Sequence, residues 1–194
     1  MKSSQKDKRN KRKKKHSISK ITLTARLKNF YVKPINNMLF KFFALICIFY
    51  ALWITPFFQQ YIVANVAIFY AQISSLFLGI FQLPVKAVGD SLTSTNFSMS
   101  IKNGCDAIEA IAILLCAMAI YPSSFKSKSI GLFVGLVLLI LLNIIRIVSL
   151  YFIGVYIPSL FEVMHVSVWQ VLFIAFPILI ILRWISWTKK IELV

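Results

Sequence analysis

Long apolar runs separated by short polar stretches make up most of the chain. The four clearest cover residues 42–58, 107–122, 130–153 and 166–184. At about 1.5 Å per residue, helices over these runs are long enough, or nearly so, to cross the roughly 30 Å hydrocarbon layer of a membrane. This pattern predicts an all-α polytopic membrane protein with about four transmembrane helices.

A fifth apolar run, residues 61–83, is also long enough to span a membrane but is less uniform. It carries amide and hydroxyl side chains at Asn65, Gln72, Ser74, Ser75 and Gln82. Cytoplasmic loops carry an excess of Lys and Arg, and a crossing here would place the basic segments 123–129 and 183–190 outside. We therefore expect four full spans, with residues 61–83 forming an interfacial or re-entrant helix.

The polar stretch VKAVGDSLTSTNFSMSIKNG, residues 85–104, separates the fifth run from the run over 107–122. Gly-Asp, Ser and Thr are dense in it, and its alternation is patchy. It predicts a small extracytoplasmic hairpin with its turn at Gly89 and Asp90.

Composition agrees with a membrane protein, because 59% of the residues are hydrophobic. The net charge of +16 belongs to a tail, since 14 of the 22 Lys and Arg precede Phe42, with Asp7 the one acid among them. Such a segment is too polar to fold by itself, and its position argues for attraction to anionic lipid rather than nucleic-acid binding. We also expect the first apolar run to be a retained signal anchor.

Three segments follow from this distribution. Residues 1–38 are expected to be a disordered basic cytoplasmic arm. Residues 39–188 form the transmembrane domain that carries the candidate catalytic residues, and residues 189–194 form a cytoplasmic tail.

Cys105 differs from the other two cysteines. Cys47 and Cys116 fall inside apolar runs, where a thiol behaves as a small hydrophobic side chain. Cys105 follows Asn103 and Gly104 at a predicted helix start, with Asn103 a candidate N-cap. Free N–H groups and the positive end of the helix dipole favour a thiolate at that place.

Two carboxylates beside Cys105 act in the opposite direction, because negative charge at Asp106 and Glu109 raises the pKa of a neighbouring thiol. Glu109 lies four residues after Cys105 on the same predicted helix face. It is left with three roles: capping the helix, pairing with Arg146 or orienting a substrate. Asp106 is expected only to favour the helix start.

A charged side chain stands within the third predicted span. A guanidinium there costs about 2.5–3.5 kcal/mol on insertion scales, so Arg146 needs a partner. The stretch LLNIIRIVS, residues 141–149, places Asn143 and Arg146 on one helix face, with Ser149 more loosely aligned. Arg146 lies about 24 Å from the cytoplasmic end of its span, in the outer leaflet. His165 opens the fourth span at the same depth and is the one histidine outside the basic arm.

Cys105, Arg146 and His165 together offer a thiol to attack, a fixed cation for developing oxyanion charge and an imidazole to move protons. That set suits acyl transfer at a peptide bond. Two other interpretations remain open. One is a non-enzymatic membrane scaffold or assembly factor, in which Arg146, Glu109 and Asn143 only hold helices together. The other is a small transporter that uses Arg146 to bind an anion. No metal and no cofactor are expected, because the sequence has no metal-ligand cluster or phosphate-binding glycine loop.

Three segments, NGCDAIEA (103–110), LNIIRIVSLYFIG (142–154) and FEVMHVSVWQ (161–170), resemble in order and spacing the signature segments of the exosortase and archaeosortase family. The approach LFLGIFQLPV (76–85) is also similar, and the resemblance covers roughly residues 60–175. Members of this family are polytopic membrane cysteine transpeptidases with an extracytoplasmic Cys, Arg and His. They cleave secreted proteins at a C-terminal tripartite sorting tail and transfer them to a surface acceptor.

The resemblance implies that Cys105 is the nucleophile, Arg146 the oxyanion-binding or substrate-orienting cation, and His165 the general acid or base. We expect Glu109 and Asn143 to support them. The implied partners are secreted proteins with a sorting tail, the lipid bilayer and a lipid or glycan acceptor, but no nucleic acid. The implied location is a prokaryotic cell (inner) membrane, with a cytoplasmic N-terminus.

The chain departs from the family pattern in two respects. Ala107 stands where many members have Gly, which reduces the backbone freedom expected there. The additional spans of the longer bacterial members are lacking, which is similar to a compact form of the exosortase H type.

Overall fold

The computed structural model describes residues 34–95, 97–102 and 104–192, so most of the predicted basic arm lies outside the described residues. The chain divides into two compact units, residues 1–43 and 44–194. Helix α2 (Pro34–Trp53) contains the boundary between them. The three strands and every helix after α2 belong to the second unit.

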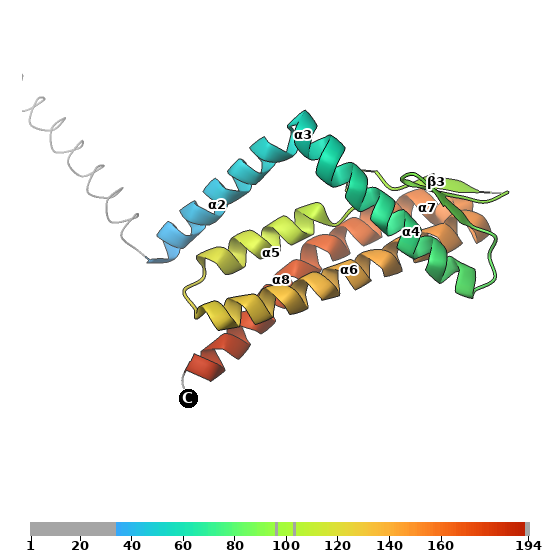
Figure 1. Ribbon diagram of the computed structural model, residues 1–194. Coiled ribbons are helices and arrows are strands. Elements are labelled where there is room, and N and C mark those ends of the chain that lie inside the picture. The colour runs from blue at the N-terminus through green and yellow to red at the C-terminus, as the bar shows by residue number, and fades with distance from the viewer. Residues whose placement is uncertain (1–33, 96, 103, 193–194) are drawn as a thin grey trace, which may run out of the picture. The chain divides into compact units, whose positions relative to one another are not determined.

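The second unit is mainly helical (Figure 1). After α2, its helices are α3 (Pro56–Phe58), the π-helix η1 (Gln59–Val63), α4 (Ala64–Ile80), α5 (Ile108–Ile120), α6 (Phe125–Tyr156), α7 (Pro158–Glu162), the π-helix η2 (Val163–Val168) and α8 (Trp169–Glu192). Three short strands, β1 (Lys86–Val88), β2 (Ser91–Thr93) and β3 (Ser98–Ser100), lie between α4 and α5 in the sequence. The predicted fold class, an all-α polytopic membrane protein with a small hairpin, is confirmed.

Four helical stretches of the described chain are long and apolar enough to cross a membrane: Asn36–Trp53, Pro56–Ile80, Phe125–Tyr156 and Pro158–Ile191. Four is the predicted number, but the four stretches are not the predicted set. The run expected not to cross belongs to a stretch of 25 residues, about 37 Å long. In contrast, α5, expected to span, has 13 residues and a length of about 20 Å. It covers the apolar run 107–122 except for Ala107 at its start and Tyr121 and Pro122 at its end.

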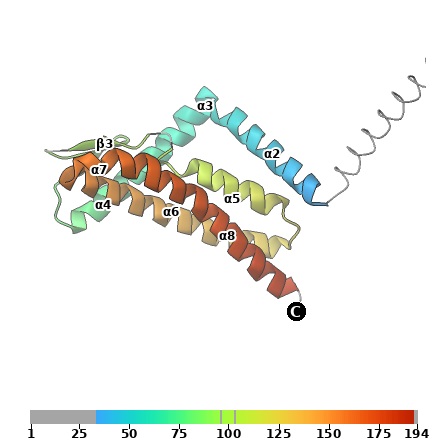
Figure 2. The ribbon, with the colours of Figure 1, turned by 180° about the vertical axis from the view of Figure 1, so that it is seen from behind.

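Helices α5, α6 and α8 pack side by side and alternate in direction (Figures 1 and 2). At one end of this group Lys128 Nζ donates to the Ala119 carbonyl at 2.8 Å, and Trp184 Nε1 donates to the Ser127 carbonyl at 2.9 Å. The start of α5 and the start of α8 lie at the other end. The basic loop before α6 and the basic end of α8 are therefore together, opposite the loop that carries Cys105.

The three strands form an antiparallel sheet in the order β1-β2-β3 (Figure 1). Val88 pairs with Ser91 across the turn formed by Gly89 and Asp90, as predicted. Gly89 has a φ of 59°, the left-handed conformation that glycine adopts at low cost. Asp90 accepts hydrogen bonds from the hydroxyls of Ser91 (2.8 Å) and Ser100 (3.1 Å), which ties β3 to the turn.

Phe97 anchors the sheet to the helices. Its ring lies edge-on to Tyr151 of α6 and Phe161 of α7, with centroid distances of 5.4 and 6.0 Å. Gly154 of α6 makes room for it, because a Cβ atom at Gly154 would overlap the Phe97 ring. The strand segment that leads to Cys105 is thus held against α6 by an aromatic side chain packed on a glycine.

Replacing Gly154 with Ala is expected to displace Phe97 and to lower the free energy of unfolding by about 1–3 kcal/mol, the usual cost of overpacking. The control is Gly79→Ala in α4, where nothing lies within 4 Å of the added methyl group and a stabilisation of up to about 1 kcal/mol is expected. Thermal unfolding of both purified variants in the same detergent gives the comparison. Equal melting temperatures for the two would show that Phe97 does not depend on Gly154.

Candidate active site

Cys105 lies in a tight loop between β3 and α5. Its N–H donates to the Lys102 carbonyl at 2.9 Å. Positive φ angles stand on both sides of it, 87° at Gly104 and 60° at Ala107. Glycine tolerates this region, whereas an L-residue such as Ala107 bears a cost of about 1–2 kcal/mol. The reduced backbone freedom expected at Ala107 therefore takes the form of a strained left-handed conformation.

Helix α5 begins three residues after Cys105, at Ile108. Its first turn is capped by Asp106, whose Oδ1 accepts a hydrogen bond from the Ile108 N–H at 3.1 Å, in line with the role expected for that carboxylate. Asn103, the N-cap expected from the sequence, lies outside the described residues. Because Cys105 precedes the helix, the helix dipole has less influence on its thiol than a position in the first turn would give.

Two side chains of α6 hold the loop. Arg146 donates through Nη1 to the Gly104 carbonyl at 2.8 Å and through Nη2 to Cys105 Sγ at 3.4 Å. Asn143 Nδ2 donates to the Cys105 carbonyl at 2.9 Å. Both side chains are buried, 3% and 0% exposed, and they lie three residues apart on one helix face. Ser149, the looser member of the predicted stripe, instead donates to the Arg146 carbonyl of its own helix.

His165 contacts the thiol from another helical segment. It belongs to η2, the π-helix between α7 and α8, and its Nε2 lies 2.9 Å from Cys105 Sγ. The Phe161 ring stacks on the imidazole, with centroids 5.8 Å apart and an interplanar angle of 26°. A π-helical turn shifts the register of side chains around a helix, and such turns are frequent at functional sites. Cys105, Arg146 and His165 thus converge from a loop and two different helices.

Arg146 has no carboxylate among its hydrogen-bond or ion-pair partners in the described chain. Besides the Gly104 carbonyl and the sulfur, its guanidinium lies over the Phe173 ring of α8, with Cζ 4.8 Å from the centroid. Glu109, one candidate partner, is half-buried in the first turn of α5, where a negative charge suits the helix dipole. Pairing with Arg146, one of the three roles left open for Glu109, is therefore not among the contacts of the described residues.

Burial dominates the electrostatics of the thiol. Burial raises the pKa of Cys105 above its ordinary value, Arg146 opposes that rise, and the charges of Asp106 and Glu109 add to it. Burial likewise raises the pKa of the Asp106 carboxyl. Because an unperturbed thiol titrates at about 8.5, this rise of the Cys105 pKa favours the neutral thiol. Its attack on a carbonyl requires transfer of its proton to a base, and His165 is the base in contact.

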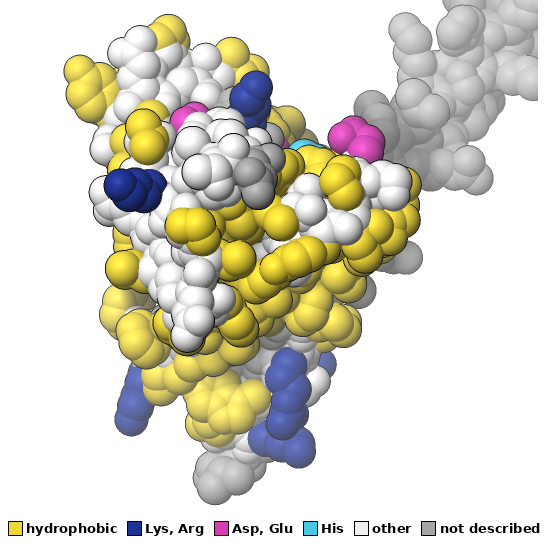
Figure 3. All heavy atoms as spheres, turned by 90° about the vertical axis from the view of Figure 1, so that its right-hand side faces the viewer, with side chains coloured by type: hydrophobic (Ala, Val, Ile, Leu, Met, Phe, Trp, Pro, Cys, Tyr) yellow, Lys and Arg dark blue, Asp and Glu magenta, His cyan; other side chains and the backbone are white. Residues whose placement is uncertain are grey.

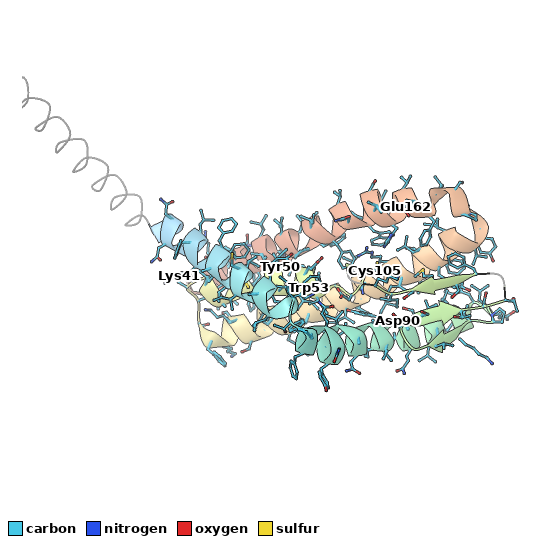
Figure 4. All side chains as sticks on the ribbon, turned by 90° about the horizontal axis from the view of Figure 1, so that it is seen from above. Lys41, Tyr50, Trp53, Asp90, Cys105 and Glu162 are labelled. Atoms are coloured by element: carbon cyan, nitrogen blue, oxygen red, sulfur yellow. The ribbon has the colours of Figure 1, made fainter. Side chains whose placement is uncertain are left out.

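Cys105 is 9% exposed, and the stick view labels it among the helices (Figure 4). Seen from the sheet end, hydrophobic side chains cover much of this face, and charged side chains are scattered over it (Figure 3).

Two aromatic residues of this site were not predicted from the sequence. Phe161 carried a weak signal, its helical spacing of four residues before His165, whereas Phe173 carried none. Among the described residues, no group of three or more His, Cys, Asp or Glu could hold a metal ion.

Comparison with known proteins supports the family predicted from the motifs. Residues 33–183 match the family described as transmembrane exosortase (Exosortase_EpsH). No curated protein and no solved structure gives a significant match. The family match covers more than three quarters of the chain and includes the loop, α6 and η2 that build the site. The chain therefore belongs to the transmembrane exosortase family.

Proposed function

We propose that this protein is a membrane cysteine peptidase or transpeptidase that processes secreted proteins bearing a C-terminal sorting tail. One observation carries the proposal: the buried Cys105 sulfur lies 2.9 Å from His165 Nε2 and 3.4 Å from Arg146 Nη2. A nucleophile in contact with both a base and a fixed cation is the arrangement that covalent acyl transfer needs. Membership of the exosortase family supports the same conclusion.

The first chemical step follows from the neutral state of the thiol. His165 Nε2 accepts the thiol proton as Cys105 Sγ bonds to the carbonyl carbon of the scissile peptide. Arg146 stabilises the sulfur while it carries negative charge. Its Nε is buried and has no hydrogen-bond partner in the described chain. A buried donor left unpaired is rare, and the oxyanion of the tetrahedral intermediate would satisfy it.

The second step releases the tail. The C–N bond breaks, and the proton that His165 took from the thiol goes to the leaving amine. The sorted protein stays attached to Cys105 as a thioester. An acceptor nucleophile, which His165 deprotonates, then forms a bond to the carbonyl carbon and expels the sulfur. Asn143 acts as a positioning residue, because its hydrogen bond to the Cys105 carbonyl fixes the loop.

The placement of charge suggests the orientation in the membrane. The basic loop before α6 and the basic end of α8 lie opposite the Cys105 loop, and basic segments favour the cytoplasmic side. The proposed orientation therefore has the site near the extracytoplasmic face of the cell membrane, with the basic loop and the basic end of α8 at the cytoplasmic face. A substrate anchored by its own tail helix would reach Cys105 from the lipid.

The nucleophile assignment predicts that Cys105→Ala abolishes cleavage of a coexpressed secreted reporter carrying a cognate sorting tail, with a loss of at least about 10³-fold. Cys116→Ala is the matched control, because that thiol lies within α5 and its replacement should leave processing intact. Cleavage is followed as the shift in reporter mass. Full processing by the Cys105→Ala enzyme would contradict the assignment, as would an equal loss in both variants.

The thiol pKa can be tested by the rate of alkylation against pH. Cys105 reacts as the thiolate, so its rate rises with pH through its elevated pKa. Asp106→Asn removes a charge that raises this pKa and keeps an oxygen for the Ile108 N–H, so the profile should move to lower pH. Arg146→Gln removes the charge that lowers it, so the profile should move to higher pH.

These rates are measured with Cys47 and Cys116 replaced by Ala, using a small, anionic, membrane-impermeant methanethiosulfonate on intact cells. Reaction before the cells are ruptured also supports the extracytoplasmic site. A shift of the Asp106→Asn profile to higher pH would refute the electrostatic account. Reaction only after rupture would refute the orientation and leave the chemistry standing.

A further inference from the structure

A groove runs between α6 and α8, on a face of α6 different from the one that carries Asn143 and Arg146. It is a cavity of about 820 Å³ with an almost wholly apolar lining, and Arg183 is the one charged residue that lines it. We propose that this groove binds an anionic phospholipid, with an acyl chain along the groove and the phosphate at Arg183. The proposal concerns a lipid site and does not depend on the proposed catalysis.

The length of the groove fits an acyl chain better than a transmembrane helix. Its lining on α6 extends from Ile130 to Ile145, which is about 22 Å of helix. One leaflet contributes about half of the 30 Å hydrocarbon layer, whereas a spanning helix needs the whole of it. A helix with its side chains is also about 10–12 Å wide. The groove therefore offers room for a chain from one leaflet, and only part of what a helix requires.

The floor of the groove is a fixed surface. Trp184 lies so close to Gly131 that a Cβ atom there would overlap the indole ring. The indole is held in place because its Nε1 donates to the Ser127 carbonyl at 2.9 Å. Trp184 is 5% exposed, so it packs into the helix pair and leaves the space beside it open. The apolar walls are thus built by the fold.

The charge at this end of the groove selects an anion. Arg183 is exposed, and no hydrogen bond or ion pair joins it to another described residue. Lys128, Lys189 and Lys190 lie at the same end of the helix group. Asp90, Asp106, Glu109 and Glu162 belong to the opposite end, whereas Glu192, the last residue of α8, is the one acidic residue of α8 at the basic end. Basic pockets between transmembrane helices are known to bind anionic lipid head groups, and the guanidinium fork matches a phosphate.

The same charge argues against a transmembrane helix with a basic end, because such an end would meet Arg183 and the nearby lysines at close range.

The two tryptophans of the groove also favour a head group at this end. Trp184 and Trp187 line the groove beside Arg183, and indole rings favour the boundary between head groups and acyl chains. The other end of the groove, at Ile145 and Phe176, adjoins the Arg146 and Phe173 pair in sequence. A bound chain would therefore brace α6 against α8 beneath the site.

The test uses the full-length chain in zwitterionic phosphatidylcholine vesicles, titrated with phosphatidylglycerol whose acyl chains are brominated. Bromine quenches nearby tryptophan, and residues 1–33 contain no tryptophan, so binding to the basic arm does not give this signal directly. Brominated phosphatidylglycerol should quench at a lower mole fraction than brominated phosphatidylcholine with the same chains. Unbrominated phosphatidylglycerol should reverse the effect, and inorganic phosphate should not.

Arg183→Gln should weaken the preference for phosphatidylglycerol about fivefold. The matched control is Lys190→Gln, an exposed cation of α8 outside the groove, which should keep the preference. Val134→Phe, which fills the groove without changing charge, should reduce quenching by both lipids. Equal quenching by the two lipids in the unaltered protein, or no effect of Arg183→Gln, overturns the proposal. Displacement of the lipid by a hydrophobic helical peptide with a basic end also overturns the proposal, because it would make the groove a helix-binding site.

Discussion

A buried guanidinium without a carboxylate partner is the constraint on which the site depends. Arg146 is 3% exposed, and its guanidinium contacts the Gly104 carbonyl, the Cys105 sulfur and the face of Phe173, while its Nε has no hydrogen-bond partner in the described chain. A charge buried within a span must be compensated, because leaving it unpaired costs several kcal/mol. The loop before α5 supplies that compensation only with a non-helical backbone. The positive φ angles on either side of Cys105 and the shortening of α5 are consistent with this requirement.

The sequence was sufficient for features that depend on local pattern. Apolar runs predicted where the long helices lie, Gly89 and Asp90 predicted the turn, and a spacing of three residues predicted that Asn143 and Arg146 share an inward face. The grouping of Cys105 with Arg146 and His165 also followed, because predicted topology placed them at one depth. What they do chemically remains a prediction, supported by their geometry.

Features that depend on tertiary compensation were beyond prediction. Local propensity favours helix from Ala107 onward, yet that residue has a left-handed conformation. The distribution of Lys and Arg led us to expect residues 61–83 not to cross, although they fall largely in a stretch long enough to do so. A single amino-acid sequence carries no pattern that indicates the π-helical turn at His165 or the contact of Arg146 with Phe173. Pairing of Glu109 with Arg146 is absent from the structure, which leaves helix capping and substrate orientation as its open roles.

The central claim is covalent catalysis by Cys105, and the most direct test is to identify the residue that carries the substrate. The enzyme and a tail-bearing reporter are mixed without an acceptor, quenched in acid within the first turnover, and digested for mass spectrometry. The account predicts a hydroxylamine-sensitive thioester that joins the new C-terminus of the reporter to Cys105. A covalent adduct on any other residue, formed at the rate of cleavage, would contradict it.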